Sequence, residues 1–242
     1  MTFRIAMWSG PRNISTAMMR SWENRSDTEV VDEPFYAFYL NKTRSPHPCF
    51  EEVLQSQSCD YDQVASQLSK DVCDSKVQYQ KHMTHHMLTG FDLNWVKGLK
   101  HCFLIRSPDQ VVNSYTNSRG VCTAEDIGIK RQFELYQEIS QISGQDIPII
   151  DSNDVLKDPQ RILGVLCEKL GIPFLPTMLK WPQGTRTSDG VWAKHWYKSV
   201  DSSSGFAPYS AKHLQLNDEQ LSVVEQVQPF YEELYKKRIG AE

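Results

Sequence analysis

Two stretches of the sequence combine residue types that bind anions. The first follows an apolar run at 5–8, and its members are Gly10, Pro11, Arg12, Asn13, Ile14, Ser15 and Thr16. A strand, a tight turn and a helix start, in this order, bring backbone N–H groups and the positive end of a helix dipole to one point. Arg12 adds a fixed, forked positive charge. The stretch predicts a phosphate- or sulfate-binding loop, although alone it also fits an ordinary strand-to-helix turn with a Ser/Thr cap.

The second stretch begins with Arg106, at the end of an apolar run, and reaches Ser114 eight residues later. Pro108 suits the first turn of a helix. Ser114 would then lie nearly two turns into that helix, on the side that can face Arg106. Without the first stretch, the same residues would indicate only a charged strand end and an exposed serine.

The first stretch does not fit the triphosphate-binding pattern GxxxxGK[ST], because it has no second glycine and no lysine. Hydrolysis of a nucleoside triphosphate also needs an aspartate that helps to hold Mg²⁺. Asp151 is a weak candidate for that role. A kinase of a small metabolite therefore stays open as the enzymatic alternative, and a non-catalytic nucleotide-binding protein as the other.

Taken together, the two stretches resemble the motifs of the sulfotransferase family, whose members use 3′-phosphoadenosine 5′-phosphosulfate (PAPS). In that family PKSGTTW binds the 5′-phosphosulfate and RxPxxxxxS binds the 3′-phosphate. Here the segment 11–17 stands for the first motif, with Arg12 in place of its lysine and Ala17 in place of its tryptophan. The second motif matches fully from Arg106 to Ser114. About residues 3–170 are covered, and small soluble sulfotransferase-like proteins are the most similar branch.

This resemblance implies roles for the matching residues. Arg12, Ser15, Thr16 and the loop amides would hold the phosphosulfate, and Arg106 and Ser114 the 3′-phosphate. The product would be adenosine 3′,5′-bisphosphate, and no metal would be required.

The resemblance leaves two kinds of general base open. Some branches of the family use a glutamate just after the second strand, which here is Glu33, the favoured candidate. Others use a histidine at the end of the strand at 76–82, which suggests His82 or, by a looser match, His85 or His86. Lys81 could help to position the sulfate.

Adenine must be stacked by a residue other than Ala17, and Trp192 or Trp196 could do so. The segment 182–213 is rich in Gly, Ser and Trp and only partly resembles the family's RKGxxGDW element, with Gly190 and Trp192 fitting. We expect it to cover the cofactor, because loops of this length in compact domains are commonly lids or binding segments.

Strands alternating with helices predict a three-layer α/β/α fold, with a mainly parallel central sheet of the P-loop nucleotide-binding type, in a single domain over 1–242. The expected strands are 5–8, 29–31, 76–83, 101–105 and 147–150. The expected helices are 17–22, 50–57, 61–73, 109–118, 125–142, 159–170 and 217–237. The segment 36–48 is expected to be irregular because of Pro46 and Pro48.

The formal net charge of −4 and the pI near 6.0 argue against nucleic acid or an anionic membrane as partner. No apolar run reaches the length of a membrane span, and no leader pattern is visible. Six cysteines without a CxxC pair indicate reduced thiols and a cytoplasmic protein. The sequence gives no indication of oligomeric state.

The expected activity is sulfuryl transfer from PAPS to a hydroxyl or amine of a small-molecule acceptor. The aromatic run at 35–39 would form a wall of the acceptor pocket or simply pack in the core.

Overall fold

The computed structural model describes residues 2–211 and 214–240, so the last two residues of the expected 182–213 segment lie outside it. Its centre is a five-stranded sheet in the order β2-β3-β1-β4-β5. The strands are β1 (Phe3–Ser9), β2 (Thr28–Asp32), β3 (Val77–Met83), β4 (Lys100–Ile105) and β5 (Ile149–Asp151). Every pairing is parallel. All five predicted strands are thus present, and their carboxyl ends meet at one edge of the sheet.

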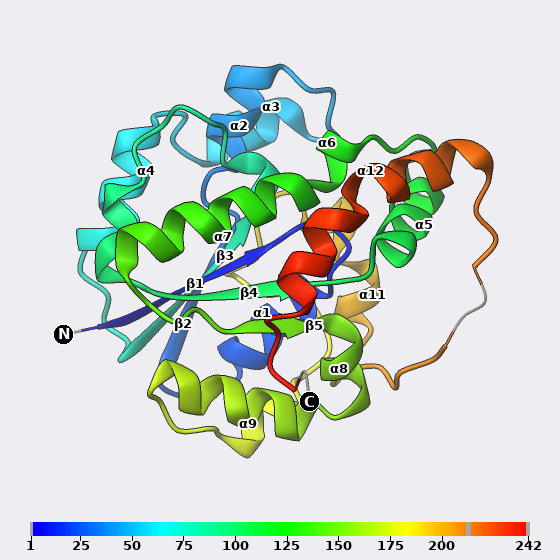
Figure 1. Ribbon diagram of the computed structural model, residues 1–242. Helices are drawn as coiled ribbons and strands as arrows, with labels where there is room; N and C mark the ends of the chain where they lie inside the picture. The colour runs from blue at the N-terminus through cyan, green and yellow to red at the C-terminus, as the bar shows by residue number, and fades with distance from the viewer. Residues whose placement is uncertain (1, 212–213, 241–242) are drawn as a thin grey trace.

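Helices cover both faces of the sheet because side chains alternate along each strand. In β1, Ile5 and Met7 belong to the apolar cluster under α1 (Ser15–Glu23) and α9 (Pro159–Leu170). Ala6 and Trp8 point the other way, into the cluster that includes α4 (Tyr61–Lys70), α7 (Ile129–Ser143) and α12 (Asp218–Tyr235). Figure 1 shows these two helical layers on either side of the strands. The predicted three-layer α/β/α architecture is confirmed.

The remaining helices and 3₁₀ turns lie between these elements along the chain. They are α2 (Tyr36–Thr43), α3 (Phe50–Ser56), α5 (Pro108–Arg119), α6 (Ala124–Ile127), α8 (Ser152–Lys157), α10 (Ala193–Trp196), α11 (Lys198–Asp201) and the 3₁₀ turns η1 (Thr84–His86), η2 (Asn94–Gly98) and η3 (Pro176–Leu179). The helix expected at 125–142 is two helices, because Gly128 takes a left-handed conformation with φ of 61°. The expectation of an irregular segment from 36 was wrong, since α2 ends at Thr43, before either proline.

The segment after residue 180 forms a closed loop on the side of α1. Its base is fixed by an antiparallel bridge between Lys180 and Gly205. Its far part is fixed by Arg20 of α1, whose two terminal nitrogens donate to the Asp189 carboxylate at 2.6 and 2.8 Å. Arg20 and Asp189 are both buried, so this pair holds the loop firmly against α1. The described residues 206–211 and 214–217, which precede α12, lie on the outside of the molecule (Figure 1).

Within the described residues, no helix combines the length and apolarity needed to cross a membrane.

Candidate active site

A cavity of about 350 Å³ opens at the carboxyl edge of the sheet, where ligands bind in open α/β folds. We call it the main cavity. Its lining comes from the loop after β1, from the ends of β2, β3 and β4, from α5, and from the closed loop at 196–207. The lining includes most of the predicted site, namely Pro11, Arg12, Asn13, Ile14, Ser15, Thr16, Glu33, Arg106 and Ser114.

The loop after β1 leaves the amino end of α1 open. Arg12 and Ile14 adopt left-handed conformations, with φ of 63° and 58°, which cost roughly 1–3 kcal/mol each for residues other than glycine. Ile14 is the N-cap, and no side chain caps the helix. The loop is therefore not an ordinary strand-to-helix turn with a Ser/Thr cap. Uncapped N–H groups at the start of a helix can bind an anion.

Gly10 is needed because the loop passes very close to α6. A Cβ atom at this position would lie 2.7 Å from the carbonyl oxygen of Ile127. Asn13 is also structural in part, since its buried amide donates to the carbonyl oxygen of Leu104 at 3.1 Å. These two contacts hold the loop in place between β4 and α6.

The two predicted motifs form a single site. Arg12 Nε donates to the Ser114 hydroxyl oxygen at 3.0 Å, and Arg106 donates to the carbonyl oxygen of Arg12 at 2.7 Å. Neither arginine forms a salt bridge with any residue that the structure describes. Burial, followed by the charge of Arg12, lowers the pKa of Arg106. Two neighbouring arginines without an acidic partner can bind a phosphate group through charge-assisted hydrogen bonds.

Glu33 and Lys81 form an ion pair in the lining of the main cavity. Lys81 Nζ donates to Glu33 at 2.6 Å, to Asp32 at 2.9 Å and to the Tyr197 hydroxyl at 2.6 Å. The Tyr197 hydroxyl in turn donates to the Asp32 carboxylate, whose oxygens lie 2.7 and 2.8 Å away. The backbone N–H of Gly190 donates to Asp32 at 3.1 Å. Asp32 thus anchors the closed loop to the sheet.

The buried ion pair changes the proton affinity of both partners. Burial raises the pKa of Glu33, with a further rise from Asp32, and Lys81 only partly opposes it. Burial alone would lower the pKa of Lys81, but the carboxylates of Asp32 and Glu33 outweigh it and raise that pKa. Lys81 therefore keeps its charge, and Glu33 accepts a proton more readily than an exposed glutamate.

His82 lies outside the main cavity, which corrects its place among the predicted site residues. Side chains alternate along β3, so Lys81 faces the site while His82 faces the opposite apolar layer. Its ring stacks on Trp8 with 4.3 Å between centroids, and its Nε2 lies 3.1 Å from Gln80 Oε1. Burial lowers the pKa of His82 to about 3.

His85 and His86, in η1, do line the main cavity. Burial lowers the pKa of His85 to about 3 and that of His86 well below its ordinary value. The buried Nδ1 atom of each ring has no hydrogen-bond partner among the described residues. Both imidazoles are therefore neutral near neutral pH.

Trp192 is likewise not a cavity residue. It is 1% exposed, packs in the layer under α1, and donates from Nε1 to the Tyr197 hydroxyl at 3.1 Å. A stacking role for Trp192 is therefore not available in this structure. Trp196, its alternative, lines the main cavity.

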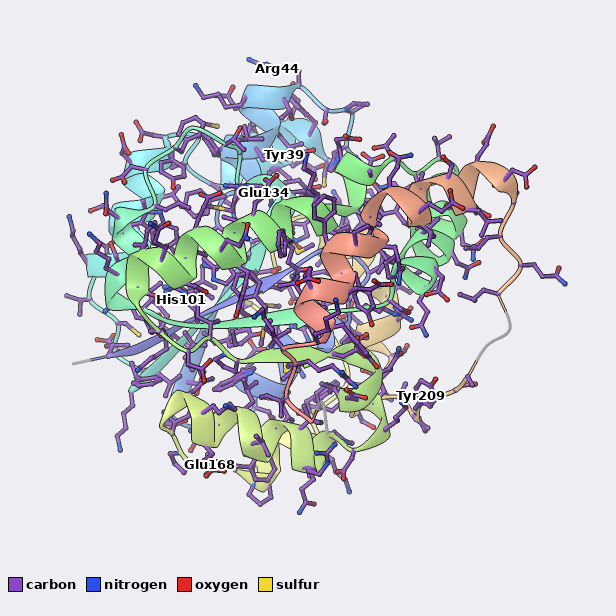
Figure 2. All side chains as sticks on the ribbon, in the orientation of Figure 1. Tyr39, Arg44, His101, Glu134, Glu168 and Tyr209 are labelled. Atoms are coloured by element: carbon purple, nitrogen blue, oxygen red, sulfur yellow. The ribbon has the colours of Figure 1, made fainter. Side chains whose placement is uncertain are left out.

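A second, polar cleft of about 400 Å³ adjoins the main cavity and shares Arg12, Arg106 and Ser114 with it. Amide side chains such as Asn113 and Asn153 contribute to this polar cleft. Its outer wall includes Tyr209, which Figure 2 shows on the extended segment leading to α12. Lys157 Nζ lies 4.8 Å from the centroid of the Tyr209 ring.

Several cavity residues were not predicted individually, and His47, Arg119 and Tyr197 are among them. Tyr197 and His47 lie in segments without periodicity, and nothing in the sequence marks them. Arg119 could have been found, because it lies on the helix of the second motif, five residues after Ser114.

Comparison with known proteins identifies the family. A model of the sulfotransferase domain matches residues 3–238. The chain belongs to the sulfotransferase domain family. The resemblance expected from Arg12, Arg106 and Ser114 is thus confirmed.

The curated relatives are longer proteins. Branched-chain-amino-acid aminotransferase-like proteins 1 and 2 of Arabidopsis thaliana are 37% and 34% identical over 203 residues, which are 84% of this chain. This chain spans only 36% of the length of each. Among solved structures, the sulfotransferase from Alicyclobacillus acidocaldarius superposes with a TM-score of 0.56 at 11% identity, covering 97% of this chain and 94% of that one. This last similarity concerns the fold alone.

Asp151, considered above for Mg²⁺, has structural partners and lines neither cavity. It caps α8 by accepting from the Asn153 N–H at 2.8 Å, and it accepts from the Tyr231 hydroxyl at 3.1 Å. Over 2–211 and 214–240, no three His, Cys, Asp or Glu side chains are grouped so that they could hold a metal ion.

Proposed function

We propose that this domain transfers a sulfuryl group from PAPS to a hydroxyl or amine of a small-molecule acceptor, in the cytoplasm and without a metal. The observation that carries the proposal is the hydrogen bond from Arg12 to Ser114, with Arg106 against the Arg12 carbonyl oxygen. It joins the loop at the start of α1 to the Arg106–Ser114 motif. A donor with one anion on each side of the ribose would use both parts at once.

The residues fit such a donor. The open amino end of α1, with Ser15 and Thr16 in its first turn, and Arg12 would hold the phosphosulfate. Arg106 and Ser114, at the junction with the polar cleft, would hold the 3′-phosphate. When bound, PAPS supplies an electrophilic sulfuryl group and adenosine 3′,5′-bisphosphate as leaving group.

Arg12 and the α1 amides would stabilise the negative charge that grows on the leaving phosphate. They are fixed in place before the reaction by the Ser114 and Arg106 contacts, so little reorganisation is needed.

Glu33 is the best placed general base. Its carboxylate lines the main cavity, and its raised pKa suits it to take the proton of the acceptor. His85 and His86 are weaker candidates, because their pKa values are lowered far below the working pH. Lys81 would hold the Glu33 carboxylate in place.

We do not assign an aminotransferase activity to this chain from the names of its relatives. That name describes whole proteins of which this chain spans 36%. The family match over 3–238 concerns a sulfotransferase domain instead.

Calorimetric titration of adenosine 3′,5′-bisphosphate, AMP and ATP tests the donor assignment. We expect the bisphosphate to bind tighter than both others. Arg106→Ala should weaken it by about tenfold or more, because a charge-assisted hydrogen bond is lost. Lys130→Ala, at an exposed position outside both cavities, is the control. Equal affinity for AMP and the bisphosphate, or a preference for ATP, would refute the assignment and favour a kinase.

Transfer itself is measured with radiolabelled PAPS and a set of small alcohols, phenols and amines. Labelled product is the expected result. Binding of the bisphosphate without product from any acceptor would instead support a non-catalytic nucleotide-binding protein.

A further inference from the structure

The main cavity has one end that the polar cleft does not share. Residues at the junction, such as Arg12, Arg106 and Ser114, line both spaces. The far end is lined by Glu33 and Arg119 together with aromatic and histidine side chains, none of which borders the polar cleft. If the nucleotide occupies the polar cleft, this far end is left for the acceptor.

Arg119 is the unexplained charge at the far end. Its guanidinium carbon lies 4.3 Å from the ring centroid of Trp196 and 5.8 Å from that of Tyr115. Among the residues that the structure describes, it forms neither a salt bridge nor a hydrogen bond. Stacking on an indole fixes the plane of the guanidinium and leaves its N–H groups free to bind a ligand.

The position of Arg119 on its own helix does not account for this arrangement. It is the last residue of α5, where a cation is favoured by the helix dipole. Its guanidinium, however, lies over the ring of Trp196 in α10, which also lines the main cavity, and no hydrogen bond joins it to the last carbonyls of α5 among the described residues. The side chain is therefore directed into the site.

The other charges of the cavity already have partners or roles. Glu33 and Lys81 pair with each other at 2.6 Å. The neighbouring histidines are neutral: burial lowers the pKa of His47 to about 4 and that of His85 to about 3, and the charge of Arg119 contributes to both shifts. Arg119 thus has no salt-bridge partner among the described residues, and a half-buried cation without such a partner favours an anionic ligand.

We propose that Arg119 binds a carboxylate of the acceptor, so that the substrate is an anionic small molecule carrying both a carboxylate and the hydroxyl or amine to be modified. This inference rests on the proposed function. A carboxylate matches the planar fork of a guanidinium and can bind it in a bidentate way. With its anion at Arg119, the acceptor presents its nucleophile toward Glu33, and Tyr36, Trp196 and Phe206 offer apolar wall to its body.

The test compares acids with their neutral amides on the protein loaded with adenosine 3′,5′-bisphosphate. The probes are glycolate, lactate and 4-hydroxyphenylacetate, each paired with its amide, and calorimetry gives the affinities. We expect at least one acid to bind about tenfold tighter than its amide. Arg119→Gln should abolish that preference, and Arg119→Lys should restore part of it. Both variants should leave the affinity for the bisphosphate unchanged.

Arg161→Gln, an exposed arginine outside both cavities, is the matched control and should change nothing. No acid preference in any pair would overturn the inference. So would a similar loss of bisphosphate affinity in Arg119→Gln, because Arg119 would then serve the donor. If the wild type fails to bind the bisphosphate at all, the proposed function fails instead. The acid–amide comparison on the protein alone then still decides the role of Arg119.

Discussion

The carboxyl group of Glu33 owes its expected reactivity to three neighbours rather than to its own chemistry. Its backbone has a φ of 44°, unusual for glutamate, which turns the side chain back toward Lys81 at the end of β3. Asp32 and the Tyr197 hydroxyl hold Lys81 from the other side. The sequence could place Glu33 and Lys81 at the ends of two strands, but it could not show that Tyr197 also holds Lys81, because Tyr197 comes from a loop without periodicity.

Glu33→Gln should leave binding of adenosine 3′,5′-bisphosphate unchanged and slow transfer by about 10²–10⁴-fold, since the amide keeps the shape but cannot accept a proton. Single-turnover transfer from radiolabelled PAPS measures the rate, and calorimetry measures the binding. His85→Gln is the comparison variant, because His85 lines the same cavity with a depressed pKa. Normal transfer by Glu33→Gln together with loss in His85→Gln would move the role of base to His85.

At the scale of elements, the sequence predicted the regular parts well. Strands β1, β4 and β5 were predicted because their apolar runs are buried and stand out, and β3 was predicted from its alternating side chains. The element α2 was not predicted because its segment ends in Pro46 and Pro48, but both prolines lie beyond Thr43, where α2 ends. His82 was placed on the wrong face because the pattern of β3 did not show which of its two faces carries the site.

The close approach of the loop after β1 to α6 gives a prediction at this scale. Gly10→Ala should destabilise the protein by about 1–3 kcal/mol, because the new Cβ would push against the Ile127 carbonyl oxygen. It should also weaken bisphosphate binding, since the loop must shift. Gly164→Ala is the control: its Cβ would meet no atom within 4 Å in α9, so a gain of about 1 kcal/mol is expected. Chemical denaturation measures the stability of both variants, and calorimetry measures their affinity for the bisphosphate. Wild-type stability and affinity in Gly10→Ala would contradict the role assigned to this glycine.

For the whole molecule, buried histidines set the response to acid. Burial lowers the pKa of His82 and His85 to about 3, and that of His47 and His101 to about 4, against 6.5 for the unfolded chain. The contribution of these neutral histidines to the free energy of unfolding is complete above pH 6.5. It is lost as the pH falls toward their pKa values in the folded protein, because the unfolded chain takes up the protons first. Each histidine contributes up to about 1.4 kcal/mol per pH unit in that window.

Raised carboxyl pKa values act in the opposite direction. Burial raises the pKa of Glu33 and of Asp151, which favours the folded state in acid. Two carboxyl groups do not balance five histidines, since burial lowers the pKa of His86 as well. The melting temperature by scanning calorimetry should therefore fall between about pH 7 and about pH 5. His82→Phe, which keeps an aromatic ring against Trp8, should flatten this slope, whereas exposed His195→Gln should not. A melting temperature independent of pH over this range would contradict the prediction.

The anchoring of the closed loop to Asp32 has a consequence for synthesis on the ribosome. The Tyr197 and Gly190 contacts with Asp32 bridge 165 and 158 residues of sequence. Strands β1 to β3 and the loop after β1 are synthesised early, but Lys81 and Asp32 then still lack their shared partner, the Tyr197 hydroxyl. Contacts of this span form late, because the entropy of closing so long a loop must be overcome first. The nascent chain should therefore acquire a folded sheet well before the main cavity is complete, and the cavity lining from the closed loop should be added last.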